Sequence, residues 1–211
     1  MFRILQSSTY YVILIKKIKS EVISMSEKAP DRRTQRTRKA LFDALAELLT
    51  EKQLHKVTVQ EISDKAQVNR VTFYNHFLDV YDLYDKIEEN TLVELGLLVL
   101  QLEELPAQEF FKHIIEYIND NRTIFKMIFS PNATGQLRYK LNKLIEGVFR
   151  QIQTEKLKAD INDKKLEYIS CYRAQGCLAV ISKWVLEDFR EPNDFIIKAI
   201  SSLDSSLESS F

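Results

Sequence analysis

Glycine and proline are scarce in this chain, with 4 of each among 211 residues. Average usage would place about 12% of residues in these two types. Because sheets need many tight turns of that chemistry, the shortage excludes a protein built from many strands. The stretches between these glycines and prolines are rich in Leu, Glu, Lys, Ala and Gln. The sequence therefore predicts an all-α fold.

The chain also lacks the features of most enzymes and membrane proteins. Its two cysteines, Cys171 and Cys177, match no metal or redox spacing and fit buried thiols in a reducing compartment. We find no glycine-rich phosphate loop, no metal-ligand cluster and no defensible pairing of nucleophile and base. No apolar run reaches the ~18 residues of a membrane span. We therefore expect no catalysis, metal, cofactor or membrane span, and a cytoplasmic, nucleoid-associated location.

The 30 basic and 30 acidic side chains cancel but are unevenly placed. Residues 1–77 hold 14 basic and 8 acidic side chains, whereas residues 78–211 hold 16 and 22. A difference of this size also occurs by ordinary scatter. If it is functional, the basic part favours a polyanionic partner that the acidic part would repel.

The first residues differ in character from the rest. The apolar run at 10–15 is shorter than the hydrophobic region of a signal peptide, and no small-residue cleavage site follows it. Met25 begins a plausible soluble start, so we interpret residues 1–24 as the product of an upstream start codon. The alternative is a peripheral membrane anchor. Residues 1–30 are accordingly expected to be a poorly ordered or mis-annotated leader.

A helix-turn-helix pattern follows the leader. Apolar residues between 34 and 51 recur at helical spacing and predict a first amphipathic helix. Thr58 and Glu61 form a capping box that begins a second, short helix. Asn69 is a suitable N-cap for a third helix that ends near Phe77. Two short helices joined by a tight turn are typical of a helix-turn-helix domain.

The third helix has two distinct faces. At 100° per residue, Phe73 and Phe77 share an inward face. The residues on the other side suit a DNA groove, and we expect them to contact bases or phosphates: Arg70, Val71, Thr72, Tyr74 and Asn75. The alternative is an ordinary solvated face, for which Val71 and Tyr74 are unusual choices.

This region resembles the DNA-binding signature of the TetR/AcrR family of transcriptional regulators. The most specific part is the core Thr-Phe-Tyr-x-His-Phe at 72–77. The resemblance implies a helix-turn-helix domain at 31–78, a helical effector-binding and dimerisation domain at 79–211, and double-stranded DNA as a partner. Carried over by position, the implied DNA contacts are Thr58, Asn69, Arg70, Val71, Thr72, Tyr74 and His76.

Three positions depart from the family's pattern. Gln67 stands at a usual glycine, which costs roughly 1 to 2 kcal/mol if the turn is left-handed. Val71 stands at a frequent glycine and should change the base preference. Val80 stands at a frequent phosphate-binding lysine. Other basic side chains could supply that charge nearby: Arg32, Arg33, Arg36, Arg38, Lys56 and Lys86. The arginine run before the first helix is expected to be either a solvated, mobile face or an arm that touches the minor groove or the DNA backbone.

The acidic part contains an aromatic stretch from 107 to 130. Aromatic residues at helical spacing are most often core, but apolar side chains also line ligand pockets. Four residues are therefore candidates for an effector pocket: Phe110, Phe125, Phe129 and Trp184. The effector is expected to be a small molecule or a protein.

The two last helical segments predict a homodimer. The segment 163–190 is apolar on two sides, which requires a second neighbour. Small residues along it would let another helix approach, and the final segment adds further apolar positions. We expect both segments of each subunit to form a twofold four-helix interface, which the family resemblance also implies. The alternative is a larger monomer core.

The predicted function is a DNA-binding transcriptional regulator. We expect a repressor that binds a pseudo-palindromic operator as a homodimer and is released or modulated by an effector. The alternative is an activator or adaptor of the same fold, controlled by a protein partner. A conspicuous cavity would favour a small effector, whereas a filled core with an exposed apolar patch would favour a protein.

Overall fold

The computed structural model describes residues 32–102, 105–158, 160 and 163–208. The predicted leader at 1–30 lies outside these residues. Within them the chain forms helices and no strand, which confirms the all-α prediction. No helix in this part is long and apolar enough to cross a membrane. The helices are α2 (Arg32–Glu51), η2 (Leu54–Lys56), α3 (Val59–Lys65), α4 (Arg70–Tyr74), α5 (Val80–Leu102), α6 (Ala107–Asp120), α7 (Arg122–Phe129), α8 (Gln136–Leu157), α9 (Lys164–Leu186) and α10 (Asn193–Glu208).

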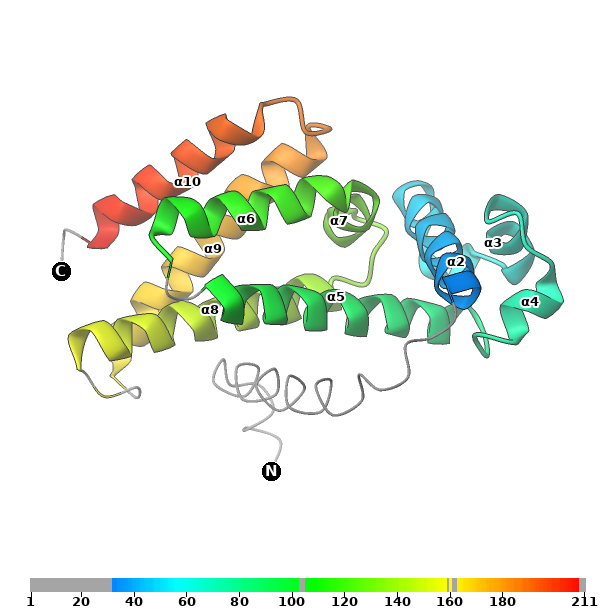
Figure 1. Cartoon of the computed structure of the whole chain (residues 1–211), viewed down its shortest axis with the longest axis horizontal. Coiled ribbons are helices and arrows are strands. Elements are labelled where there is room, and N and C mark those ends of the chain that lie inside the picture. Colours follow the sequence, from blue (N-terminus) through cyan, green and yellow to red (C-terminus); the bar gives the residue numbers. More distant parts are fainter. Residues whose placement is uncertain (1–31, 103–104, 159, 161–162, 209–211) are drawn as a thin grey trace.

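Helices α2, α3 and α4, which we call the head, lie at one end of the molecule (Figure 1). The apolar stripe of α2 is fully buried at Leu41, Leu45 and Leu49. These side chains belong to one cluster with Ile62 of α3 and Phe73 of α4. The helical spacing of leucines therefore identified the buried face of α2, and this face holds the two short helices in place.

Helices α5 to α10, which we call the body, form a bundle. Helix α5 lies along α8, α8 packs on α9, and α6 lies beside α10 (Figure 1). Helix α7 contacts α2 of the head as well as α8 and α9 of the body. The buried residues of head and body form one continuous cluster. The orientation of the head thus depends on how α2 packs against α7 and α5.

Two boundaries differ from the sequence analysis. The third helix ends at Tyr74 with Asn75 as its C-cap, earlier than the predicted end near Phe77. The aromatic stretch divides into α6 and α7 at Asn121, whose φ of −114° and ψ of 36° interrupt the helix. The Asn121 side chain donates to the Tyr117 carbonyl at 2.8 Å and so caps α6. The spacing of apolar residues gives no sign of a local cap of this kind, so it did not predict the break at Asn121.

Candidate nucleic-acid interface

Helix α3 begins at a complete capping box. The Thr58 hydroxyl accepts from the Glu61 backbone N–H at 3.3 Å, and the Thr58 backbone N–H donates to Glu61 Oε2 at 3.0 Å. Lys52 of α2 also pairs with the Glu61 carboxylate. The hydrogen bond from Lys52, followed by those from Thr58, lowers the pKa of Glu61 to about 2. The predicted start of α3 is therefore confirmed, and Glu61 additionally ties α3 to α2.

The turn between α3 and α4 is a left-handed helix end. Gln67 has a φ of 56°. The Val68 N–H donates to the Ser63 carbonyl at 2.9 Å, and the Gln67 N–H donates to the Asp64 carbonyl at 3.1 Å. This pair of bonds is the Schellman pattern, in which glycine is usual at the left-handed position. Gln67 therefore completes this turn in the left-handed conformation and bears the steric cost of a side chain there.

Helix α4 is held by a cap at its start and by aromatic side chains on its inner face. Asn69 Oδ1 accepts from the Val71 N–H at 2.8 Å. Phe73 is fully buried and Phe77 nearly so, with ring centroids 5.9 Å apart. Phe42 of α2 packs against Phe77 with centroids 5.9 Å apart. These contacts fix which side of this five-residue helix faces outward.

The outward side carries the predicted DNA-contact residues. Val71 is 67% exposed and Tyr74 is 51% exposed. Arg70 and Asn75 are also exposed, whereas Thr72 and His76 are half-buried. The capping groups are partly engaged already, because Asn69 Oδ1 holds the helix start and the Thr58 hydroxyl donates to Glu61 Oε2 at 2.9 Å.

Two further side chains flank this surface and were missed by the sequence analysis. Leu78, in the turn after α4, is 82% exposed, and Tyr81 on the first turn of α5 is exposed too. Val80 is buried, so it cannot meet a phosphate. The burial of Phe77 and Val80 on either side could have indicated that Leu78 and Tyr81 point outward.

The basic side chains around α4 differ in whether a neighbouring carboxylate already pairs with them. Lys65 pairs with Glu47 at 2.7 Å, and Lys86 pairs with Glu89 at 2.7 Å. The Arg38 guanidinium lies over the Phe77 ring at 5.7 Å from its centroid. Arg70 therefore supplies positive charge on α4 itself, whereas Lys65 and Lys86 are each paired with a neighbouring carboxylate.

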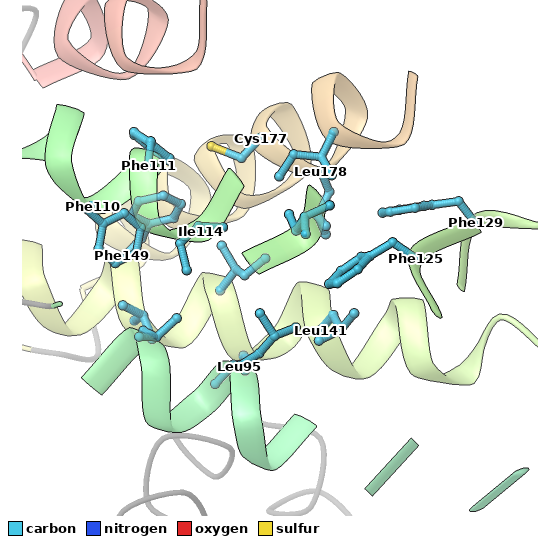
Figure 2. Close-up of a pocket in the computed structure, with 16 residues that line it drawn as sticks. Leu95, Phe110, Phe111, Ile114, Phe125, Phe129, Leu141, Phe149, Cys177 and Leu178 are labelled. Carbon is cyan, nitrogen blue, oxygen red and sulfur yellow. The ribbon is translucent and has the colours of Figure 1, made fainter. Parts of the chain in front are cut away.

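The body encloses a small apolar cavity (Figure 2). Its volume is about 60 Å³, and its walls come from α5, α6, α7, α8 and α9. Phe110, Phe125 and Phe129 line it, and the Cys177 thiol is the sole polar side chain on the wall. Burial raises the pKa of Cys177 to about 12, so the thiol remains neutral. The cavity therefore suits only an uncharged, apolar group.

The fourth candidate for this pocket, Trp184, does not line it. Its ring is buried against Phe189, with centroids 4.8 Å apart in an edge arrangement. Its Nε1–H donates to the Glu191 carbonyl at 2.8 Å. These contacts give Trp184 a packing role at the turn between α9 and α10.

Helices α9 and α10 leave large apolar side chains uncovered. The exposed residues of this kind are Tyr168, Tyr172, Leu186, Phe195 and Leu203. A Cβ added at Gly176 would meet nothing within 4 Å. A shallow groove between the two helices includes Tyr172, Gly176 and Val180. The outer surface of α9 and α10 is thus open to another helix pair.

Comparisons with known proteins agree with this geometry. A family profile described as "Bacterial regulatory proteins, tetR family" matches residues 41–86, which span the turn and α4. A second, described as "Transcriptional regulator C-terminal region", matches residues 107–204. The two matches together cover most of the head and body.

Two curated relatives are both transcriptional regulators. Over 70 residues the chain is 36% identical to the uncharacterized HTH-type transcriptional regulator YxbF of Bacillus subtilis, covering 33% of this chain and 18% of that protein. The chain therefore spans less than a fifth of that relative's length. Over 154 residues it is 27% identical to the HTH-type dhaKLM operon transcriptional activator DhaS of Lactococcus lactis, covering 71% and 80%.

Solved structures share the fold. A putative fatty acid metabolism regulator of Clostridium perfringens superimposes with a TM-score of 0.61 at 22% identity, covering 77% of this chain and 94% of that one. The transcriptional regulator FadR of Bacillus subtilis, solved in complex with stearoyl-CoA, gives 0.54 at 17% identity, covering 78% and 95%. At these identities the likeness establishes the architecture alone.

Proposed function

Because this chain belongs to the TetR family of DNA-binding transcriptional regulators, we propose that its α4 enters the major groove of an operator and that a homodimer is the binding species. The observation that carries the proposal is the division of α4 into two faces. Phe73 and Phe77 are buried under the helix, while Val71 and Tyr74 stand in solvent. The exposure of these two side chains on a five-residue helix is explained if Val71 contacts a base and Tyr74 contacts a phosphate.

We assign roles to the outward residues from their chemistry. Arg70 is suited to two hydrogen bonds with guanine, Asn75 to two with adenine, and Val71 to contact with a thymine methyl. The remaining contacts are with phosphates, through side chains that can donate a hydrogen bond: Thr72, Tyr74 and His76. These six residues would form the core of the DNA interface.

The two capping residues would contribute less than their positions in the family suggest. Asn69 Oδ1 holds the start of α4, which leaves only its amide N–H groups for DNA. The Thr58 hydroxyl donates to the Glu61 carboxylate, so it would have to give up this hydrogen bond in order to donate to a DNA phosphate. We therefore assign Asn69 and Thr58 supporting contacts with the DNA backbone.

The homodimer would form through α9 and α10. Their uncovered apolar side chains and the open space at Gly176 support a twofold four-helix contact with a second copy. Two heads related by a twofold axis would read half-sites about 34 Å apart, or a multiple of that spacing. A pseudo-palindromic operator follows from this symmetry.

The effector would act on the body. A cavity of about 60 Å³ is far below the roughly 300 to 1,000 Å³ of typical ligand sites, so a small molecule would have to displace the surrounding helices to enter. Its buried part would be apolar, because the wall offers no charge. The nearly filled core favours the second candidate, an activator or adaptor controlled by a protein partner, over a repressor released by a small ligand.

The proposal is tested by recovering genomic fragments bound to the purified full-length chain, followed by footprinting. We expect protected sites with two related half-sites, and sedimentation of a dimer on each site. A double variant, Arg70→Ala with Tyr74→Ala, should recover none of them, whereas Tyr139→Ala on the exposed side of α8 should recover all. Equal recovery by the two variants would contradict the assignment of α4.

A further inference from the structure

The loop between α7 and α8 joins the cavity wall to the head. It begins directly after Phe129, which lines the cavity, and ends before α8, whose Leu141 lines it as well. Figure 2 places Phe125 and Phe129 of α7 at one end of the cavity, with Leu141 and Leu178 facing them. Because Ser130 follows Phe129 directly, a shift of the α7 backbone at Phe129 would carry Ser130 with it.

Ser130 and Asn132 cap the far end of α2. The Ser130 hydroxyl donates to the Leu49 carbonyl at 3.0 Å in a buried contact, and the Asn132 side chain donates to the Thr50 carbonyl at 3.2 Å. The Asn132 backbone N–H donates back to the Ser130 hydroxyl at 3.1 Å. The last carbonyls of a helix lack partners within it. Here they receive them from residues more than eighty positions away.

The same loop also contacts the start of α5. The Tyr84 hydroxyl lies 3.0 Å from the Thr134 hydroxyl. One turn further, Lys140 of α8 donates to the buried Glu88 of α5 at 2.6 Å. The loop thus touches both elements that connect α4 to the body, namely α2, on which α3 packs, and α5, which follows α4 in the chain.

Among the described residues, a cleft lies along the opposite half of α2. A cleft of about 480 Å³ separates its N-terminal half from α5, α6 and α7. Its α2 wall carries Arg38, Lys39 and Asp43, facing Glu94 and Tyr117 of the body. Because α2 is capped at one end and borders this cleft along its other half, we expect a shift of the cap to turn the helix.

We propose that Ser130 and Asn132 are positioning residues for DNA binding, which set the orientation of α2, and with it α3 and α4, according to the position of α7 at the cavity. The proposal rests on the proposed function for its effect on operator affinity. Its structural part, the dependence of α2 on α7, stands without DNA.

A double-mutant cycle tests the coupling. Leu178→Phe enlarges a side chain on the cavity wall shared with Phe125 and Phe129, so we expect it to displace α7 without any ligand. We expect it to change operator affinity about fivefold or more, as an allosteric coupling would. In a Ser130→Ala background the same change should alter affinity less than twofold, and in a Ser130→Thr background the effect should return. Equal effects of Leu178→Phe in all three backgrounds would overturn the proposal.

A matched control and a DNA-free readout separate this inference from the proposed function. Asn119→Ala removes a hydrogen bond from Arg122 at the other end of α7 and should leave the effect of Leu178→Phe intact. Hydrogen exchange of free protein should show faster exchange in residues 45–52 on Leu178→Phe, but no change when Ser130 is already alanine. Failure to bind any DNA with this exchange pattern present would reject only the proposed function. Unchanged exchange would reject the coupling.

Discussion

Gln67 shows how one residue can hold an unfavourable backbone conformation. Its φ of 56° completes the Schellman turn that lets α3 and α4 cross, although glycine would adopt it without steric cost. The surrounding bonds from Gln67 and Val68 to α3 keep the residue in place. The chain therefore retains the family's turn geometry with a side chain that opposes it.

Gln67→Gly should raise the free energy of unfolding by about 1 kcal/mol. The left-handed strain of roughly 1 to 2 kcal/mol would be removed, and the greater freedom of glycine in the unfolded chain would offset part of it. Urea denaturation of the two proteins measures the difference. A loss of stability would show that the glutamine side chain makes a contact worth more than the strain.

Substitutions of Arg70 and Tyr74 should weaken DNA binding in different ways. Arg70→Ala is expected to cost about 1 to 3 kcal/mol and to relax the choice at one base pair, because it removes base contacts. Tyr74→Phe should weaken binding to all sequences alike, because it removes a phosphate donor. Binding selections with randomised operators distinguish the two patterns. Unchanged operator affinity in both variants would mean that another surface contacts DNA.

At the scale of elements, the start of α3 combines a cap with an ion pair. Thr58 supplies two hydrogen bonds to Glu61, and Lys52 links the same carboxylate to α2. One carboxylate thus contributes both to the beginning of α3 and to its attachment to α2. The Glu61 side chain is 41% exposed, so solvent screens much of this contribution.

Replacing Glu61 should change the acid limb of the stability curve. Its pKa falls from 4.5 to about 2 on folding, so its stabilisation is present above pH 4.5 and is lost as pH falls towards 2. Glu61→Gln should lower stability at neutral pH and flatten the pH dependence between those limits. Thermal unfolding from pH 2 to pH 7 measures this. Parallel curves for wild type and variant would contradict the shift.

At the scale of the whole molecule, the head and the body offer surfaces for different partners. The head lies at one end of the molecule (Figure 1). Side chains on the outward side of α4 are exposed there, and the body leaves large apolar side chains of α9 and α10 exposed. Dimerisation through the body would bring two heads into a fixed relation. Affinity for a palindromic site would then depend on side chains far from the DNA.

Tyr172→Glu should dissociate the dimer. Tyr172 lies exposed beside Gly176 on the α9–α10 groove, and a charge there would be buried without a partner in a twofold interface. Sedimentation velocity should show a monomer, and operator affinity should fall at least tenfold. Tyr139→Glu places the same charge on exposed α8 and should leave the dimer intact. A dimer that survives Tyr172→Glu would place the interface elsewhere.

Local features of the sequence were sufficient to predict where α3 and α4 begin and which face of α4 is buried. The capping box at Thr58, the N-cap at Asn69 and the inward pair Phe73 and Phe77 are settled within a few residues, and the structure confirms each. Helix periodicity likewise identified the buried side of α2. These features depend on short-range spacing, which a single sequence displays directly.

Only the tertiary structure decided the long-range contacts. The bond from Ser130 to the Leu49 carbonyl joins positions 81 residues apart, and the volume of the cavity depends on how five helices pack. The same packing placed Phe125 and Phe129 on the cavity wall but Trp184 outside it. Such contacts arise from the sum of many weak packing terms across the fold, so no local pattern in the sequence encodes them.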